Sequence, residues 1–288
     1  MELDALYNLE DLAKADRDRY LTVLAAPAGQ RDALAVLAAF NLELARIADT
    51  VSEQMLGFIR LQWWREALAE MEQGKPVRRH VVATSLAAIQ RDHDLPIAWL
   101  QQMVDARERD IAEPPAGSSE TLATVDAYLD ATSGNLIRLS LLVGGIDRQH
   151  RLVTEGARLA GIAYGLTGLI RATLFHAGAR RLMLPRAVLE QHDVNIDHLF
   201  DLRRDVQRDG HLATAIRELA GYATRQLTAL RDLRPSRAAM PALLPAKLAA
   251  LQLERLRRHD YDLFDYRSID GRPIDIWHLL FARYLGRL

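Results

Sequence analysis

Residues 32–53, DALAVLAAFNLELARIADTVSE, decide the fold class of this chain. Apolar side chains recur three and four positions apart through most of the stretch, which is the spacing of one face of an α-helix. Asn41 interrupts the apolar run, and Asp49 and Glu53 close it with two carboxylates four positions apart. The stretch predicts a helix over residues 31–56 whose buried stripe begins apolar and ends acidic.

The same periodicity continues along nearly the whole chain. Ala and Leu dominate, and no alternating strand pattern appears. The sequence therefore predicts one all-α domain over residues 1–288, built on a central helical bundle. The predicted helices cover residues 31–56, 58–72, 80–92, 96–112, 119–143, 151–176, 211–233, 239–258 and 273–286, and residues 176–200 form the least regular segment.

The composition excludes several classes of protein. The 288 residues are 49% hydrophobic, which is enough for a substantial core, and their formal charges sum to −1, so no nucleic-acid partner is indicated. Cysteine is absent, which excludes disulfides, thiolate catalysis and Cys-based zinc sites and is typical of a reducing compartment. No secretory signal and no apolar run of membrane-spanning length are present. We expect a soluble, cytoplasmic protein that is able to make peripheral contact with a membrane.

Asp49 and Glu53 support two interpretations. Carboxylate oxygens are the ligands that Mg²⁺ prefers, and proteins typically hold this ion with one or two carboxylates together with substrate phosphates. Alternatively, the pair is a charged helix edge with weak salt bridges, since Arg46 stands three positions before Asp49. The spacing by itself favours the helix edge.

Residues 154–178, TEGARLAGIAYGLTGLIRATLFHAG, carry small residues three or four positions apart. A glycine inside a helix costs up to about 1 kcal/mol relative to alanine, so several of them need a structural reason. Close approach of a neighbouring helix and a cavity for a long ligand both remain open. Because His176 stands at the end of the predicted helix, we expect it to cap the helix or to pack against it rather than to bind a ligand. Arg171 and Arg181 suit phosphate or carboxylate, although arginines in a loop are more often solvated.

Two further segments have structural interpretations. Residues 105–110, DARERD, show the pattern of a solvated charged helix face, and no chemistry is assigned to them. In residues 61–68, LQWWREAL, we expect one of Trp63 and Trp64 to face the core and the other to face the rim or a partner.

Taken together, these motifs resemble the squalene/phytoene synthase superfamily over nearly the whole chain. In its active members, two aspartate-rich motifs face each other across a helical cavity and bind the Mg²⁺ that holds two prenyl diphosphates. The first motif, Arg-x-x-Asp-Asp-x-x-Asp, falls on Arg46 to Glu53, with Thr50 and Glu53 replacing aspartates, and Tyr128 matches a family tyrosine. The resemblance implies an isoprenoid-synthase-like bundle around a central cavity, with Asp49 and Glu53 as weak metal ligands.

The second motif, Gly-x-Ala-x-Gln-Leu-Thr-Asn-Ile-Leu-Arg-Asp-x-x-x-Asp, falls on residues 161–176. Gly165 and Gly168 replace its Gln and Asn, and Ala172 and His176 replace both of its aspartates. Metal must neutralise a departing diphosphate, and carboxylates on one wall alone would hold Mg²⁺ weakly. The resemblance therefore implies that prenyl condensation has been lost, with no catalytic residue assigned and no cofactor, or Mg²⁺ if a prenyl diphosphate is bound.

Within the superfamily, the chain resembles most closely the branch of mitochondrial assembly factors for respiratory complex I. It shares with that branch the DTVSE form of the first motif and the form RATLFHAGARRLMLP at residues 171–185. The leading hypothesis is a noncatalytic protein that binds an isoprenoid or lipid, or that contacts respiratory-complex subunits during assembly at the inner membrane. The candidate ligand-binding residues are Arg46, Asp49, Glu53, Tyr128, Gly165, Gly168, Arg171, His176 and Arg181.

Two rival hypotheses stay open. An active Mg²⁺-dependent prenyltransferase of the squalene or phytoene type would need carboxylates from elsewhere, such as Asp126 or Asp130, opposite Asp49. A plain helical scaffold with a filled interior would have no cavity behind the glycines of residues 161–168.

Overall fold

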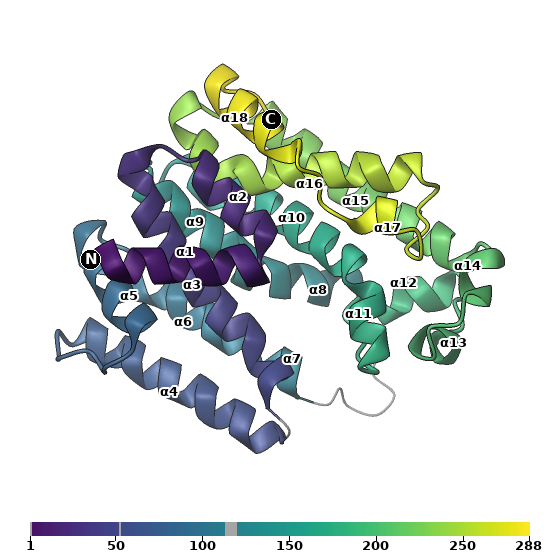
Figure 1. The fold of residues 1–288 in the computed structure, drawn as a ribbon, viewed down its shortest axis with the longest axis horizontal. Coiled ribbons are helices and arrows are strands. Elements are labelled where there is room, and N and C mark those ends of the chain that lie inside the picture. The colour runs from purple at the N-terminus through teal and green to yellow at the C-terminus, as the bar shows by residue number, and fades with distance from the viewer. Residues whose placement is uncertain (1, 52, 113–119) are drawn as a thin grey trace.

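Every regular element in residues 2–51, 53–112 and 120–288, which the computed structural model describes, is a helix (Figure 1). The predicted all-α class is therefore confirmed. The elements are α1 (Glu2–Ala15), α2 (Arg17–Ala25), α3 (Ala28–Thr50), α4 (Gln54–Glu72), α5 (Val81–Asp92), α6 (Ile97–Ala106), α7 (Glu108–Ile111), α8 (Leu122–Leu129), η1 (Asp130–Gly134), α9 (Asn135–Val143), η2 (Leu152–Gly156), α10 (Ala157–Arg171), α11 (Thr173–Gly178), α12 (Arg186–Gln191), α13 (Ile196–Phe200), α14 (Asp205–Arg208), α15 (His211–Asp232), η3 (Arg237–Ala239), α16 (Met240–Arg258), α17 (Tyr266–Ile269) and α18 (Asp275–Leu285).

The predicted helix over residues 31–56 is wrong at its C-terminal end. The chain leaves the helix after Thr50 and starts a new one, α4, at Gln54, while position 52 lies outside the described residues. The predicted helix over 119–143 is divided among α8, the π-helical turn η1 and α9, and its first position also lies outside the described residues.

Two N-terminal helices, α1 and α2, were not predicted. Asp16 caps α2 by accepting a hydrogen bond from the backbone N–H of Arg19 at 3.0 Å, which satisfies one of the free donors of the first turn. The buried side chains of α2 are few and include Arg19 itself. An apolar stripe this narrow does not stand out from a polar sequence.

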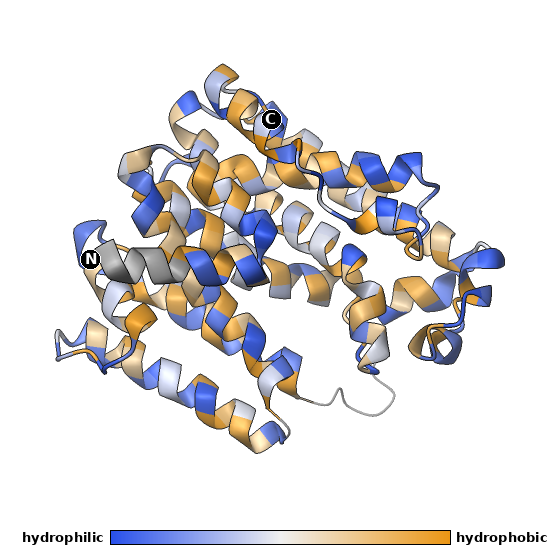
Figure 2. Cartoon of the chain, in the orientation of Figure 1, coloured by the Kyte–Doolittle hydropathy of each residue, from blue (hydrophilic) through white to orange (hydrophobic). Residues whose placement is uncertain are grey.

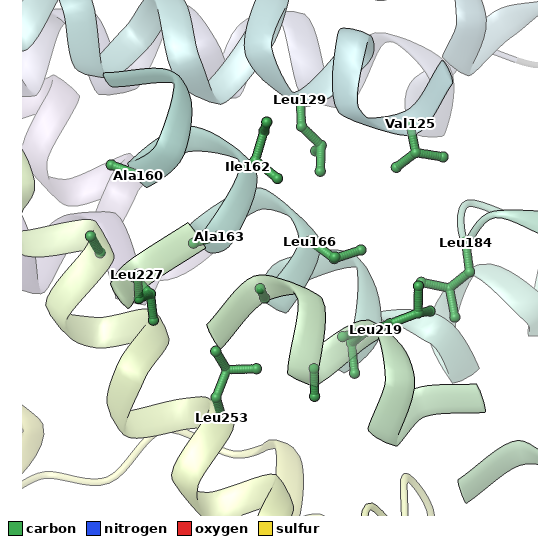
Figure 3. Close-up of a cluster of buried hydrophobic side chains, with 14 of the residues drawn as sticks. Val125, Leu129, Ala160, Ile162, Ala163, Leu166, Leu184, Leu219, Leu227 and Leu253 are labelled. Carbon is green, nitrogen blue, oxygen red and sulfur yellow. The ribbon is translucent and has the colours of Figure 1, made fainter. Parts of the chain in front are cut away.

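Helix α9 connects two hydrophobic clusters. Leu136 and Leu139 belong to the cluster around α3, α4 and α5, whereas Ile137 and Leu141 belong to the cluster around α10, α15 and α16. Side chains of α8, α10, α15 and α16 meet in this second cluster (Figure 3). Because the two clusters share one helix, the first-motif helix α3 and the second-motif helix α10 are held in one body.

The described residues contain no helix with the length and apolar content that crossing a membrane requires.

Candidate functional site

Asp49 is the last carboxylate of α3, and Glu53 lies outside the helix. The Thr50 hydroxyl donates to the carbonyl oxygen of Arg46 at 2.9 Å, and Val51 is extended, with φ −110° and ψ 139°. Two β-branched residues in succession disfavour a further helical turn. Glu53 is exposed and immediately precedes α4. The expectation that the two carboxylates share one helical stripe is therefore wrong.

Asp49 reaches across to the segment that follows the second motif. Its carboxylate accepts a hydrogen bond from Nη2 of Arg181, which lies three positions beyond α11. The Asp49 and Arg181 side chains are 39% and 27% exposed, so this ion pair lies at the surface between the two motif segments. The positive charge beside Asp49 is thus supplied by the chain itself.

His176 lies near this ion pair, and its Nδ1 atom is buried without a hydrogen-bond partner among the described residues. Burial and the positive charge of Arg181 lower the pKa of His176 from its ordinary 6.5, while the carboxylates of Asp49 and Asp110 oppose the shift. A neutral imidazole can ligate a transition metal, but it does not provide the oxygen donors that Mg²⁺ prefers.

We expect protonation of His176 to destabilise the fold in mildly acidic solution. The unfolded chain takes up a proton near pH 6.5, as in model peptides, whereas the lowered pKa makes the folded chain bind it later. The stability is therefore complete above the unfolded-state pKa and is lost as the pH falls below it. Chemical denaturation at about pH 7.5 and about pH 5.5 should show a smaller loss in His176→Gln than in the wild type. An equal loss in both proteins would contradict a buried, neutral imidazole.

Tyr128 lies at the centre of a buried polar cluster. Its hydroxyl accepts a hydrogen bond from Nη1 of Arg107 at 2.8 Å and donates one to Oδ2 of Asp110 at 3.1 Å. The guanidinium carbon of Arg109 lies 4.5 Å from the centroid of the ring, a cation–π contact. Burial raises the pKa of Tyr128, and the Asp110 carboxylate adds to the shift, so the phenol remains a hydrogen-bond donor.

The expectation that residues 105–110 form a solvated charged face holds for Asp105 and Glu108, which are exposed, but is wrong for Arg107 and Asp110. The side chains of Arg107 and Asp110 are 12% and 9% exposed and pair at 3.0 Å. Nη2 of Arg107 also donates to the amide oxygen of Asn41 at 3.1 Å, which ties this segment to α3. Asn41 was the available signal, because a polar side chain that is 4% exposed within an apolar stripe requires a buried partner.

Arg46 and Arg171, one arginine from each motif, are bound by carboxylates of the N-terminal helices. Nη1 of Arg46 donates to Asp11 on α1 at 2.7 Å. Nη1 of Arg171 donates to Asp18 on α2, and the side-chain amide of Gln252 donates to the same carboxylate oxygen at 2.7 Å. Guanidinium groups suited to phosphate are thus paired within the chain.

The glycines of α10 differ in what surrounds them. A Cβ atom on Gly161 would lie 2.4 Å from the Cα atom of Gly134, and one on Gly165 would lie 2.6 Å from a methyl carbon of Leu129. Close helix packing, one of the two open interpretations, therefore explains both positions. A Cβ atom on Gly168 would meet no heavy atom within 4 Å, so this glycine faces open space.

Two cavities adjoin α3. A small pocket between α2, α3, α9 and α16 measures about 30 Å³, enough room for a water molecule. An open groove of about 480 Å³ lies between α3 and α4, and Trp63 lines it beside His80. Trp64 also contacts the groove but is 4% exposed and packs in the core, as expected for one of the two tryptophans. The remaining lining residues of the groove are Glu43, Arg46, Ile47, Thr50 and Arg60.

The alternative acids proposed for a second metal-binding wall are engaged elsewhere. Asp126 accepts a hydrogen bond from the Tyr222 hydroxyl, and Asp130 pairs with Nη2 of Arg138 at 2.7 Å. Across residues 2–51, 53–112 and 120–288, no three His, Asp or Glu side chains are grouped so that they could hold a metal ion. The carboxylates that an active prenyltransferase would need are not assembled by this part of the chain.

Comparison with known proteins assigns the fold and its two motifs to one family. The profile described as squalene/phytoene synthase matches residues 12–273. The chain belongs to the squalene/phytoene synthase family. A relative from Mus musculus, named NADH dehydrogenase (ubiquinone) complex I, assembly factor 6, is 32% identical over 261 residues, which cover 90% of this chain and 75% of that protein.

Members named as enzymes are also similar to this chain. A presqualene diphosphate synthase from Sinorhizobium fredii is 26% identical over 174 residues, which cover 59% of each chain. The crystal structure of a dehydrosqualene synthase in complex with ligand superposes with a TM-score of 0.81 at 18% identity, covering 99% of this chain and 97% of that one. The likeness to the solved structure confirms the predicted isoprenoid-synthase-like helical fold.

The Mg²⁺ that the squalene/phytoene synthase resemblance implies does not fit the residues of this site. Asp49 is bound to Arg181, and Glu53 is exposed beyond the end of α3. The second-motif positions provide a methyl group at Ala172 and an imidazole at His176. Since Mg²⁺ demands near-octahedral oxygen ligands, no catalytic step through this metal follows from the geometry.

Proposed function

We propose that this member of the squalene/phytoene synthase family is a noncatalytic assembly factor for respiratory complex I. The proposal rests on one observation: charged side chains of both motifs are already bound by other side chains of the same protein. Arg181 binds Asp49, and Asp18 binds Arg171. A prenyl diphosphate would have to displace these partners and to ionise without the metal that normally neutralises the leaving group.

The assembly role is supported by the similarity to the Mus musculus relative, whose name is that of a complex I assembly factor. The matched region covers 90% of this chain and therefore includes both hydrophobic clusters.

Incubation of the purified chain with farnesyl or geranylgeranyl diphosphate tests the absence of turnover. With Mg²⁺ or Mn²⁺ present, diphosphate release should not exceed that of a protein-free control, because the second wall offers no carboxylates. Release that disappears in Asp49→Ala would contradict the proposal and support a working prenyltransferase.

Deletion of the gene tests the assembly role. Membranes of the deletion strain should lose most of their NADH-dependent complex I activity, and the wild-type gene should restore it. Asp49→Asn should restore it too, because a half-exposed ion pair contributes only about 0–1 kcal/mol and no metal chemistry is required. Normal activity in the deletion strain would refute the assembly role. Failure of Asp49→Asn alone, with folding intact, would point to chemistry at the motif.

A further inference from the structure

One face of α18 is apolar, and the described chain leaves it uncovered. The opposite face, with Leu279 and Ala282 at 0% and 4% exposure, packs against α16 and α2. Helix α18 lies at the outer edge of the molecule, and its ribbon includes hydrophobic residues (Figure 2). The uncovered side chains, with their exposed fractions, are Ile274 56%, Trp277 61%, Phe281 61%, Tyr284 67% and Leu285 60%.

The spacing of these side chains, three or four positions apart, places them along one side of the helix. The helix itself is firmly held. Asp275 accepts hydrogen bonds at 2.9 and 2.8 Å from Nη2 of Arg255, and the two side chains are 4% and 6% exposed. Near the other end, Arg283 donates to the carbonyl oxygen of Ala25 at 2.8 Å. The uncovered face is therefore a fixed feature of the surface.

Arginines outnumber exposed carboxylates around this face, where Asp270 is exposed two positions before Arg272. Between Arg272 and Leu288, the single carboxylate side chain is Asp275, which is buried, whereas Arg272 and Arg287 are exposed. The guanidinium carbon of Arg237 lies 5.1 Å from the ring centroid of Tyr284. The apolar face thus has arginines at both ends.

We propose that this face of α18 docks on the surface of an anionic bilayer, with Trp277 and Phe281 entering the boundary between headgroups and acyl chains. Helices that lie in this boundary combine aromatic residues on one side with arginine or lysine nearby. Tryptophan and tyrosine favour that depth, and anionic headgroups attract the arginines. The inference does not depend on the assembly role, because it rests on exposed side chains of residues 272–287, none of which belongs to either motif.

A second copy of the chain is a poorer partner for this face. Pairing two copies through α18 would bring Arg272 and Arg287 of each into one interface. Asp270 carries the one exposed side-chain carboxylate of residues 266–288, and it is outnumbered by these arginines. Like charges brought together without partners disfavour association. An anionic lipid surface satisfies the same arginines.

Vesicle flotation of the full chain tests the proposal. Vesicles of phosphatidylcholine with about 30% phosphatidylglycerol should bind the wild type, and pure phosphatidylcholine should bind it about tenfold less. Trp277→Ser combined with Phe281→Ser should lower the partition coefficient on the anionic vesicles about tenfold. A matched control, Met55→Ser combined with Ile59→Ser, removes two side chains that are 66% and 56% exposed on α4 and should bind as the wild type does.

Three outcomes would overturn the proposal. They are no binding of the wild type to the anionic vesicles, an equal loss in both double variants, and a concentration-dependent dimer that the α18 variant abolishes. Far-UV circular dichroism should show unchanged helix content in both variants, since the substituted side chains are exposed. Arg272→Ser combined with Arg287→Ser should remove most of the preference for anionic vesicles, and an unchanged preference would refute the role of the arginines.

Discussion

Arg107→Met should lower the free energy of unfolding by about 3–5 kcal/mol, the cost of breaking a buried ion pair by removing one partner. Arg107 pairs with Asp110 at 3.0 Å and also donates to the Tyr128 hydroxyl and the Asn41 amide oxygen. Without the guanidinium, the Asp110 carboxylate is left in a site where its side chain is 9% exposed. Urea denaturation followed by circular dichroism measures the loss.

Two comparisons separate this burial effect from a general loss of charge. Arg107→Met combined with Asp110→Leu should recover much of the stability, because removing both partners of a buried pair leaves no uncompensated charge. Arg151→Met should change the free energy of unfolding by at most about 0.5 kcal/mol, since Arg151 is 70% exposed in its pair with Glu155. A cost for Arg107→Met as small as that for Arg151→Met would contradict the buried cluster.

The helices were predictable from the sequence where they bury a wide apolar stripe. The prediction over residues 211–233 agrees with α15 (His211–Asp232), whose buried side chains recur every three or four positions. The prediction over 239–258 agrees with α16 (Met240–Arg258), which is buried on all sides over its first seven residues. The end of α3 was not predictable from apolar spacing, since Thr50 and Val51 stop the helix through backbone preference rather than through polarity.

The candidate site was only partly predictable. The resemblance implied that the two motifs face each other, and Asp49 of the first motif does pair with Arg181, five positions beyond the second motif. The side chains that pair with the charged residues of the two motifs could not be inferred from periodicity, because they lie far away along the chain. Asp49 and Arg181 are 132 positions apart, and Asp18 and Arg171 are 153 positions apart. Such pairs depend on how whole helices pack.

The same limit applies to the small residues of α10, where spacing left close packing and a cavity equally open. The structure separates the two by position. Gly161 and Gly165 lie against η1 and α8, whereas Gly168 faces open space. The π-helical turn η1 (Asp130–Gly134) brings the backbone of Ser133 and Gly134 against α10. A π-helical turn cannot be predicted from apolar residues that recur with a period of 3.6.

Gly161→Ala is the second substitution for which we expect a large loss. Its Cβ atom would lie 2.4 Å from both the backbone N and the Cα atoms of Gly134, and backbone cannot rotate away as a side chain does. Overpacking of this kind lowers the stability by about 1–3 kcal/mol and occasionally more. The higher helix propensity of alanine raises the stability by less than about 1 kcal/mol. A net loss of about 2 kcal/mol should appear as a lower midpoint of urea denaturation.

Gly168→Ala is the matched control, because it makes the same change seven positions along the same helix. Its Cβ atom would have no heavy atom within 4 Å, so the propensity gain should dominate and raise the stability by up to about 1 kcal/mol. Changes of opposite sign in the free energy of unfolding would establish that α10 packs closely against η1 at Gly161 but has free space beside Gly168. If Gly161→Ala were as stable as Gly168→Ala, α10 would be able to move away from η1, and the small-residue face would then border a space that can open for a ligand.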